Sequence, residues 1–371
     1  MIDIIVWMLL PTMFVFAFWY YLYRIIKVAL NQIIGECQSR KRKCISIIIS
    51  AMIALPAMNL YSVWSIFIMH VAALSIVMDL FVKLINQVYH GPVPILLKRV
   101  YYSRIIAIVA VIIILTYGYW NMKQIRQTEY TITTTKHIRE EGYEIALFAD
   151  LHFGTTMDLE QLDCQLDRIE KQEPDLVLLD GDIVDENTSL EEMEAVFLRL
   201  GRMKSNFGVY YVYGNHDKSS YSQNPNYTEE QLESAIISAG IMLLEDSNIT
   251  INDELVLVGR GDTAEKEIER MTASQLLEQV DTSKELIVMD HQPVDYEEVQ
   301  EAGFDLILSG HTHGGQIWPT GLIAKMFHTA DLNYGYEKMD NLQAIVTSGI
   351  AGWGYPIRTQ QHSEYVWIHL Q

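Results

Sequence analysis

Residues 309–316 are Ser-Gly-His-Thr-His-Gly-Gly-Gln, and this stretch decides both the fold class and the chemistry of the chain. It follows Phe-Asp-Leu-Ile-Leu at 304–308, whose length and apolar composition predict a buried strand. His311 and His313 stand one residue apart just past the strand end. Because alternate residues of an extended segment point in opposite directions, the pair suits two adjacent ions better than one. The glycines around them allow a sharp turn and a close approach to an ion or a phosphate.

Metal-binding side chains follow predicted strands at five places along the chain. The segments are Asp150-Leu151-His152, Asp180-Gly181-Asp182, Gly214-Asn215-His216-Asp217, Asp290-His291-Gln292 and the stretch quoted above. Any one of them alone is more typical of a surface turn than of a metal site, because Asp, Asn and Gly are common turn residues. Five at strand ends indicate a site, because open α/β sheets place their sites beyond the carboxyl ends of strands.

The residue types in these segments favour a two-metal centre. Imidazole, carboxylate and amide ligands together suit Mn, Fe or Zn better than Mg or Ca alone. Two such ions, about 3.5–4 Å apart and bridged by a carboxylate, activate a hydroxide and hold phosphoryl oxygens. The sequence contains no Gly-x-Ser-x-Gly segment and no Cys-x-x-Cys pair. Neither a covalent hydrolase mechanism nor a thiolate zinc site is therefore indicated.

Alternating apolar runs and helical patterns predict an α/β architecture from residue 143 onward. The predicted helices cover 159–171, 190–203 and 228–239. The predicted strands cover 143–149, 175–179, 208–213, two or three short segments within 241–257, 286–289, 304–308, 344–347 and 365–369. A first strand is predicted at 129–136, within a linker at 121–142. The strands that follow residue 240 suggest a second sheet packed on the first.

In their order along the chain, the five segments resemble the blocks of the calcineurin-like metallophosphoesterase superfamily. Those blocks are Asp-x-His, Gly-Asp, Gly-Asn-His-Asp, a single His and Gly-His-x-His. The resemblance extends from about residue 144 to the C-terminus. Gly-His-Thr-His-Gly-Gly-Gln, followed by Trp318-Pro319, is most similar to the bacterial membrane-associated branch, which includes enzymes similar to UDP-2,3-diacylglucosamine hydrolases. The resemblance implies a catalytic domain over 143–371, folded as a four-layer α/β/β/α sandwich with two central sheets.

The resemblance also implies a role for each residue of the site. The first ion would be held by Asp150, His152 and His313, the second by Asn215, His291 and His311, and Asp182 would bridge the two ions. His216 would contact the scissile phosphate together with Asn215 and protonate the leaving oxygen, and Asp217 would orient the His216 ring. Arg358 is either a phosphate contact, since a guanidinium suits bidentate phosphate binding, or a surface ion-pair partner.

The net charge of −20 divides sharply along the chain. Residues 1–120 carry ten basic and three acidic residues, whereas the rest carries 17 basic and 44 acidic residues. A nucleic acid needs a basic footprint, so we expect no nucleic-acid partner for the acidic part. Solubility alone also accounts for its acidity.

The first 120 residues predict an all-α membrane region. Four apolar segments are the candidate spans, at about 4–23, 45–60, 62–82 and 105–120, since about 20 apolar residues cross a bilayer core. The segments 24–43 and 83–104 carry six and four basic residues. With four spans both lie on one side, and the excess of Lys and Arg makes that side cytoplasmic. We therefore expect a multi-pass protein of the cell membrane with its catalytic domain outside the cytoplasm.

The preferred hypothesis is a membrane-anchored dimetal phosphoesterase that hydrolyses a phosphodiester or pyrophosphate bond. Its expected partners are the lipid bilayer and a phosphate-ester substrate, and the anchor favours a lipid-linked one. A phosphomonoesterase or nucleotidase is the alternative within the enzyme class. A catalytically silent, metal-binding membrane sensor is the alternative outside that class.

Overall fold

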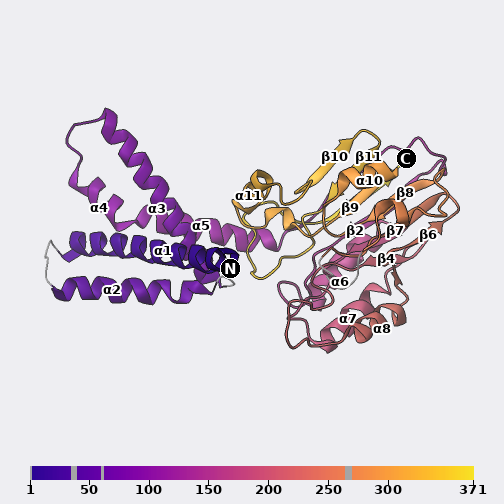
Figure 1. Ribbon diagram of the computed structural model, residues 1–371, viewed down its shortest axis with the longest axis horizontal. Coiled ribbons are helices and arrows are strands. Elements are labelled where there is room, and N and C mark those ends of the chain that lie inside the picture. Colours follow the sequence, from indigo (N-terminus) through magenta and orange to yellow (C-terminus); the bar gives the residue numbers. More distant parts are fainter. Residues whose placement is uncertain (1, 35–39, 60–61, 264–269) are drawn as a thin grey trace. The chain divides into compact units, whose positions relative to one another are not determined.

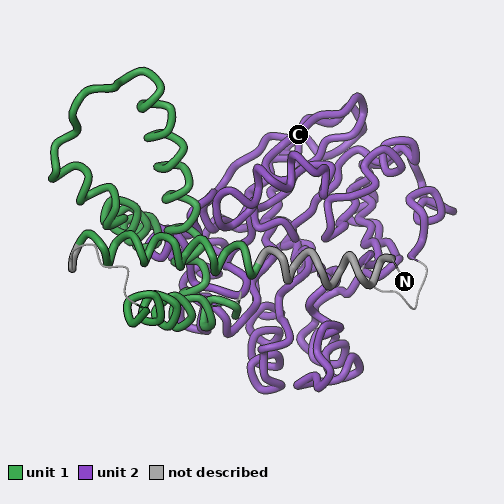
Figure 2. The backbone as a smooth tube through the Cα atoms, turned by 60° about the vertical axis from the view of Figure 1, so that its left-hand side comes forward, with its two compact units in different colours: residues 1–117 green, residues 118–371 purple. Residues whose placement is uncertain are grey.

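The computed structural model describes residues 2–34, 40–59, 62–263 and 270–371, without the side chains of 2–14, 33 and 34. Its contacts divide the chain into two units (Figure 2), residues 1–117 and 118–371. Unit 1 contains the helices α1 (Ile2–Ile34), α2 (Arg40–Ala54), α3 (Val63–Val88) and α4 (Ile95–Ser103), with a short 3₁₀ turn at Pro56–Met58. The boundary between the units lies within α5 (Ile105–Met122).

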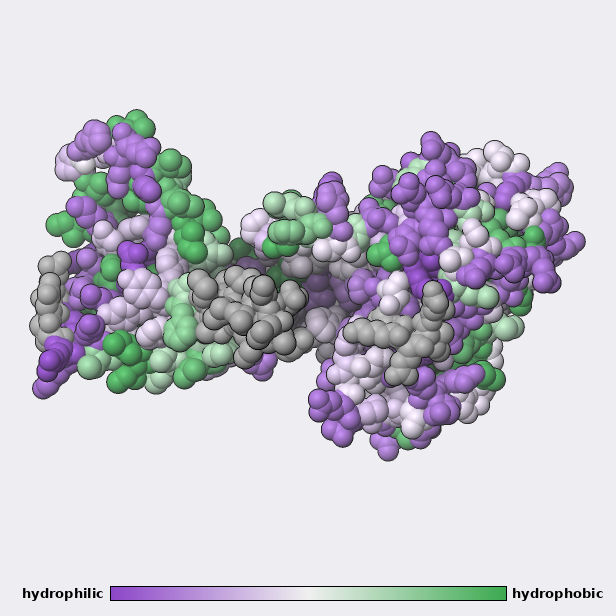
Figure 3. Space-filling model, viewed as in Figure 1, coloured by the Kyte–Doolittle hydropathy of each residue, from purple (hydrophilic) through white to green (hydrophobic). Residues whose placement is uncertain are grey.

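Two helices of the described part of the chain, α3 and α5, are long and apolar enough to cross a membrane, judged by length and composition. Figure 3 shows broad hydrophobic areas on the helices of unit 1. The expectation of four spans is thus met for two of them only. The predicted span 4–23 falls on α1, where the side chains of 4–14 lie outside the described residues.

The predicted span at 45–60 is wrong. The helix α2 has only 15 residues, and it begins with the four basic residues 40–43. Its apolar part ends at Ala54 and covers about 15 Å, about half the thickness of a hydrocarbon core. The absence of charged residues after residue 43 suggested a span, but the helix is too short to cross the membrane.

Unit 2 consists of two six-stranded sheets. The first has the order β1 (Ile125–Ile132), β12 (Ser363–Leu370), β2 (Tyr143–Phe148), β3 (Leu176–Asp180), β4 (Val209–Val212) and β5 (Met242–Leu243). The second has the order β10 (Gly335–Met339), β11 (Leu342–Val346), β9 (Leu306–Ser309), β8 (Glu285–Met289), β7 (Leu255–Gly259) and β6 (Ser247–Ile251). The α/β prediction is confirmed, but β10 was not expected, and the first strand begins four residues before its predicted start.

Helices cover the outer face of each sheet (Figure 1). Alternate residues of a strand serve opposite faces. Tyr143, Ile145 and Leu147 of β2 point into a core shared with β7, β8 and β9, whereas Ala146 and Phe148 pack under helices. The helices over the first sheet are α6 (Leu159–Glu170), α7 (Leu190–Leu200) and α8 (Glu229–Ser238). Those over the second are α9 (Ala273–Leu276) and α10 (Tyr296–Ala302). The result is four layers, helix, sheet, sheet and helix.

Three helices of the first layer begin at capping boxes that the sequence encodes. Asp158 with Gln161 starts α6, Ser189 with Glu192 starts α7, and Thr228 with Gln231 starts α8. In each pair the side chain of the first residue accepts a hydrogen bond from the backbone N–H of the second residue. The side chain of the second residue accepts a hydrogen bond from the backbone N–H of the first. These starts fix the helices against the strand ends that carry the site.

Glu285 gives the stability of this unit a pH dependence. The residue is fully buried at the start of β8, where its carboxyl accepts a hydrogen bond from Thr134 at 2.5 Å. Burial raises the pKa of Glu285 to about 7. Its stabilising contribution is therefore full at low pH and is lost as the pH rises through about 7. We expect Glu285→Gln, which keeps the acceptor, to raise the free energy of unfolding at pH 8 by up to about 3 kcal/mol.

Denaturant unfolding of the full chain in detergent, at pH 5 and pH 8, measures this effect. The difference between the variant and the parent should be large at pH 8 and small at pH 5. An identical difference at both pH values would show that Glu285 does not titrate between them.

Candidate metal centre

The predicted ligands meet where the two sheets end side by side. In the first sheet, β2, β3 and β4 run parallel, so the loops that follow them lie at one edge. In the second sheet, β8 and β9 are parallel as well. The backbone N–H of His311, after β9, donates to the Asp150 carboxylate, after β2, at 3.1 Å. This contact joins the loops of the two sheets at a single site.

Asp150, His152 and His313 form the first group of candidate ligands. Their ligand atoms lie within 4.8 Å of one another, and all three residues are buried. The Nε2 atoms of His152 and His313 are 3.2 Å apart, and Nε2 of His313 lies 3.4 Å from Oδ1 of Asp150. The group has the membership that the resemblance implies for the first ion.

Asp182, His291 and His311 form the second group. Oδ2 of Asp182 lies 3.1 Å from Nε2 of His291. Asn215 adjoins the group, with its Oδ1 atom 2.7 Å from Nδ1 of His311. The same Oδ2 of Asp182 lies 3.7 Å from Nε2 of His152 in the first group. Asp182 therefore stands between the two groups, in the place of a bridging carboxylate.

The unsatisfied ring nitrogens show that this donor set fits divalent cations. Nδ1 of His291 lies 2.7 Å from the carbonyl of Asp180, which directs Nε2 toward the Asp182 carboxylate. A cation between Nε2 and the carboxylate oxygen, which are 3.1 Å apart, would satisfy both atoms. Within the described residues, Nε2 of His291 and Nδ1 of His313 are buried without a hydrogen-bond partner. A mixed nitrogen and oxygen set of this kind suits Mn, Fe or Zn.

The loops that hold the ligands adopt strained backbone conformations. Asp150, His152, Asp182, His311 and His313 all have positive φ, between 41° and 67°. Such conformations cost about 1–3 kcal/mol each for residues other than glycine and cluster at functional sites. The expectation of an extended segment at 311–313 is wrong, because a 3₁₀ turn begins at His313. His311 and His313 still belong to different ligand groups, because the turn directs their side chains apart, as an extended segment would.

His216 lies beside both groups and is held by a residue that the sequence analysis missed. Its Nδ1 atom is 3.0 Å from a carboxylate oxygen of Glu186, and its ring centroid is 5.3 Å from that of His152. Burial lowers the pKa of His216, but the hydrogen bond to Glu186 and the charge of Asp182 outweigh it, and the pKa is raised. The contact with Glu186 thus fixes the His216 ring beside both ligand groups.

Asp217 does not take the orienting role predicted for it. Its carboxylate accepts the backbone N–H groups of Asp182, Ile183, Val184 and Gly214 at 2.6–3.1 Å. These four N–H donors occupy the carboxylate, so Asp217 fixes the loop that carries Asp182. The imidazole of His216 is held by Glu186 instead. Because Asp217 adjoins His216 in sequence, it was predicted as the hydrogen-bond partner of the His216 ring, but that partner is Glu186.

Arg358 contradicts both of its predicted roles. The side chain is 0% exposed, and its terminal nitrogens donate to the carbonyls of His313 and Ala351 at 2.8 Å and 2.6 Å. Burial lowers the pKa of Arg358 to about 10. With both terminal nitrogens engaged below the surface, Arg358 positions the backbone of His313 and neither reaches a substrate nor forms a surface ion pair.

Two further polar residues support the site. Oδ2 of Asp185 lies 3.3 Å from Nδ1 of His152, which orients that ring. Gln316 donates to the carbonyls of Trp353, Tyr355 and Ile357 and accepts from the N–H of Trp353. It therefore shapes the loop that brings Trp353 to 5.4 Å from the His216 ring. Asp185 and Glu186 follow Asp182 by only three and four residues, so a short loop keeps both carboxylates near the ligands. This spacing was the signal in the sequence for their supporting roles.

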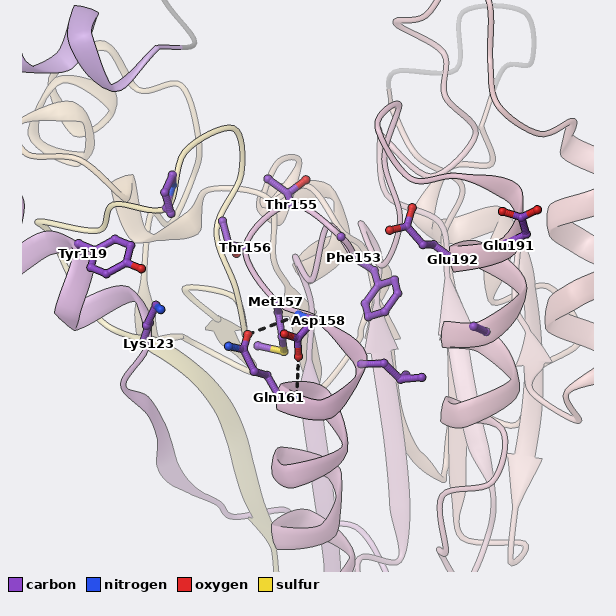
Figure 4. Close-up of a pocket in the computed structure, with 14 residues that line it drawn as sticks. Tyr119, Lys123, Phe153, Thr155, Thr156, Met157, Asp158, Gln161, Glu191 and Glu192 are labelled. Carbon is purple, nitrogen blue, oxygen red and sulfur yellow. Dashed lines mark hydrogen bonds between the residues drawn. The ribbon is translucent and has the colours of Figure 1, made fainter.

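Figure 4 shows a cavity of about 650 Å³ on the first sheet's side of unit 2. Its walls come from the end of α5, the loop 153–159 and the start of α7. Thr155 in this wall donates to Asp185, which contacts His152. Asp158, labelled in the same wall, is occupied as the cap of α6. No candidate ligand lines the cavity, so its link to the site is the contact of Thr155 with Asp185.

Comparison with known proteins agrees with this geometry. The calcineurin-like phosphoesterase family matches residues 143–315. An uncharacterized metallophosphoesterase of Helicobacter pylori strain J99 is 31% identical over 232 residues, which cover 62% of this chain and 60% of the relative. A transmembrane protein with metallophosphoesterase domain from Bos taurus is 26% identical over 62% of this chain and 53% of its own length. Phosphodiesterase YaeI of Escherichia coli is 29% identical over 47% of this chain and 62% of its own length.

The chain thus spans about 60% of the length of the first curated relatives that it matches. The match covers every predicted ligand segment, from Asp150 to His313. Residues 143–315 of this chain therefore form a calcineurin-like phosphoesterase domain.

Proposed function

We propose that this chain is a membrane-anchored, metal-dependent phosphoesterase that hydrolyses a phosphodiester or pyrophosphate bond. The observation that carries the proposal is the position of Asp182, whose Oδ2 faces ring nitrogens of both ligand groups. Two bound ions would supply positive charge for phosphoryl oxygens and would lower the pKa of a water molecule. Mn, Fe and Zn are the candidates.

Side chains of the protein would bind the substrate and transfer the proton. Asn215 lies at the second group, and its proposed roles are to hold the second ion and to contact a phosphate oxygen. His216, on the same loop, delivers a proton to the leaving oxygen, and Glu186 keeps its ring in place. The similarity to a protein named phosphodiesterase YaeI favours a diester or a pyrophosphate over a simple monoester.

We also propose that the catalytic unit lies outside the cytoplasm. The candidate spans α3 and α5 flank a segment with Lys98, Arg99 and Arg104, and Lys83 lies in the last turns of α3 at the same end, so the excess of Lys and Arg makes this segment cytoplasmic. One crossing through α5 then carries residues 123–371 to the opposite side. This assignment depends only on the segment between α3 and α5 and not on any span before residue 63. The bilayer and a lipid-linked phosphate ester, as in the UDP-2,3-diacylglucosamine hydrolase branch, are the proposed partners.

The test uses the full chain in detergent, stripped of metal and then given Mn, Fe or Zn in turn. We expect the stripped protein to be inactive and one of these metals to restore cleavage of bis(p-nitrophenyl) phosphate. Cleavage of p-nitrophenyl phosphate alone would make the protein a phosphomonoesterase. Tight metal binding, measured by calorimetry, without turnover of either ester or of a pyrophosphate-linked lipid would favour the sensor.

A further inference from the structure

The helix α11 (Thr320–Phe327) carries an apolar stripe that the described part of unit 2 does not cover. Leu322, Ile323, Met326 and Phe327 are exposed, the last two by 67% and 73%. Residues four apart share one face of a helix, so these four side chains form a single stripe. Trp318, just before the helix, is also exposed. Figure 3 shows hydrophobic surface at α11 where most of the surrounding surface of unit 2 is hydrophilic.

The opposite side of α11 is anchored, so the stripe is held outward. Gly321 is the buried residue of the helix, and a Cβ there would lie 2.3 Å from the side-chain nitrogen of Gln360. The backbone N–H of Gly321 donates to Gln360 at 3.3 Å, and that of Trp318 donates to Thr359 at 2.9 Å. The segment 357–361, which we call the strap, thus fixes both the start of α11 and the residue before it.

The strap also holds the end of α5, the second candidate span. The N–H of Arg358 donates to the carbonyl of Gly118 at 3.0 Å. The Asn121 amide donates to the carbonyls of Arg358 and Gln361 at 3.0 Å and 2.6 Å. One short segment therefore ties the apolar stripe to the place where α5 enters unit 2.

The residues near the stripe have the chemistry that suits a lipid surface. Tyr119 and Trp120, at the end of α5, are exposed aromatic residues of the kind that mark a membrane interface. The exposed Lys325 of α11 adds a basic group beside the stripe, which suits anionic headgroups. A short helix with aromatic, aliphatic and basic residues in this arrangement lies in the plane of the interface, with its apolar face about 5–10 Å deep.

We propose that α11 and Trp318 form a second membrane contact, which rests on the bilayer beside the end of α5. Trp318 follows His313 by five residues, so the contact is made by the segment that directly continues the ligand loop. The contact would bring the mouth of the site to the headgroup level, where a lipid-linked phosphate ester is presented. The inference rests on the proposed membrane anchoring.

The test measures lipid contact in a way that does not require turnover. The three cysteines are replaced by Ser, Phe327→Cys is labelled with an environment-sensitive fluorophore, and the full chain is placed in nanodiscs of phosphatidylcholine and phosphatidylglycerol. Ile237→Cys, an exposed residue of α8, is the control position. We expect nitroxide lipids labelled near the headgroup end of the acyl chain to quench the probe at 327 several-fold more than at 237.

Two outcomes would overturn the inference. A probe at 327 with the emission of an aqueous fluorophore and no quenching would mean that the stripe faces water. A blue-shifted but unquenched probe would mean that another part of this chain, or a second copy, covers it. Met326→Glu, at an exposed position that does not disturb the fold, should reduce the quenching at 327 to the control value.

The quenching and the proposed function fail separately. A chain that shows the quenching but cleaves no ester would overturn the function and leave the membrane contact intact. If the chain cleaves the soluble diester but the probe at 327 is not quenched, the membrane contact is overturned and the proposed function stands. If both hold, Met326→Glu should raise KM for a vesicle-borne ester and leave kcat on the soluble diester unchanged.

Discussion

Asp182→Asn is expected to lower kcat about a thousandfold, a loss of roughly 4 kcal/mol of transition-state stabilisation. The carboxylate has one oxygen facing ring nitrogens of both ligand groups. The other oxygen accepts the N–H of His216 at 2.8 Å, a contact that the Asn oxygen can keep. The substitution therefore removes the bridging charge with little change in shape. Metal analysis of the purified variant should show fewer ions per chain than in the parent.

Asp180→Asn is the matched control. Asp180 lies two residues away and is equally buried, but its carboxylate belongs to neither ligand group, and no hydrogen-bond partner is found for it among the described residues. Its link to the site is its backbone carbonyl, which the substitution retains. We expect this variant to stay within about tenfold of the parent rate. Equal losses in the two variants would assign the effect to the loop rather than to the bridging position.

The ligand segments could be predicted because each follows one of the parallel strands of its sheet. Once the strands at 143–149, 175–179 and 208–213 are recognised, their carboxyl ends must meet at one edge. The residues Asp150, Asp182 and Asn215 then come together without knowledge of any other contact. The sandwich brings in His291 and His311 because the second sheet also ends its parallel strands at that edge.

The supporting residues could not be predicted, because their partners depend on loop conformation. Asp217 adjoins His216 in sequence, yet a carboxylate among four backbone N–H groups gains more than it would from one imidazole. Glu186 reaches His216 only because the loop after β3 turns back over the site. Arg358 looked like a surface residue, since a strand and loop pattern does not show that carbonyls of two other loops converge on its guanidinium.

The membrane region shows the limit of hydropathy as a guide. Apolar length predicted a span at 45–60, but Pro56 begins a 3₁₀ turn and the preceding helix ends at Ala54. The apolar stripe of α11 was missed for the opposite reason. Its eight residues are too few to suggest a span, and only the packing of Gly321 against the strap shows which side remains exposed.

His216→Ala is expected to lower kcat by about 10²–10⁴-fold on esters with a poor leaving group. An alkoxide must receive a proton as it departs, whereas p-nitrophenolate is stable without one. The loss should therefore be much smaller on the p-nitrophenyl diester than on a methyl or alkyl analogue of it. A merely structural role of the ring would lower both rates by the same factor, so the dependence on the leaving group identifies the proton donor.

Two further variants complete this experiment. Glu186→Gln keeps an acceptor for Nδ1 of His216 and removes the charge, so we expect about a tenfold loss with the same dependence on the leaving group. His369→Ala removes a histidine of the terminal strand whose partner is Glu144, outside both ligand groups, and should leave the rate unchanged. If His216→Ala lost equal activity on good and poor leaving groups, another proton donor would have to be sought, and the ring would be a phosphate contact alone.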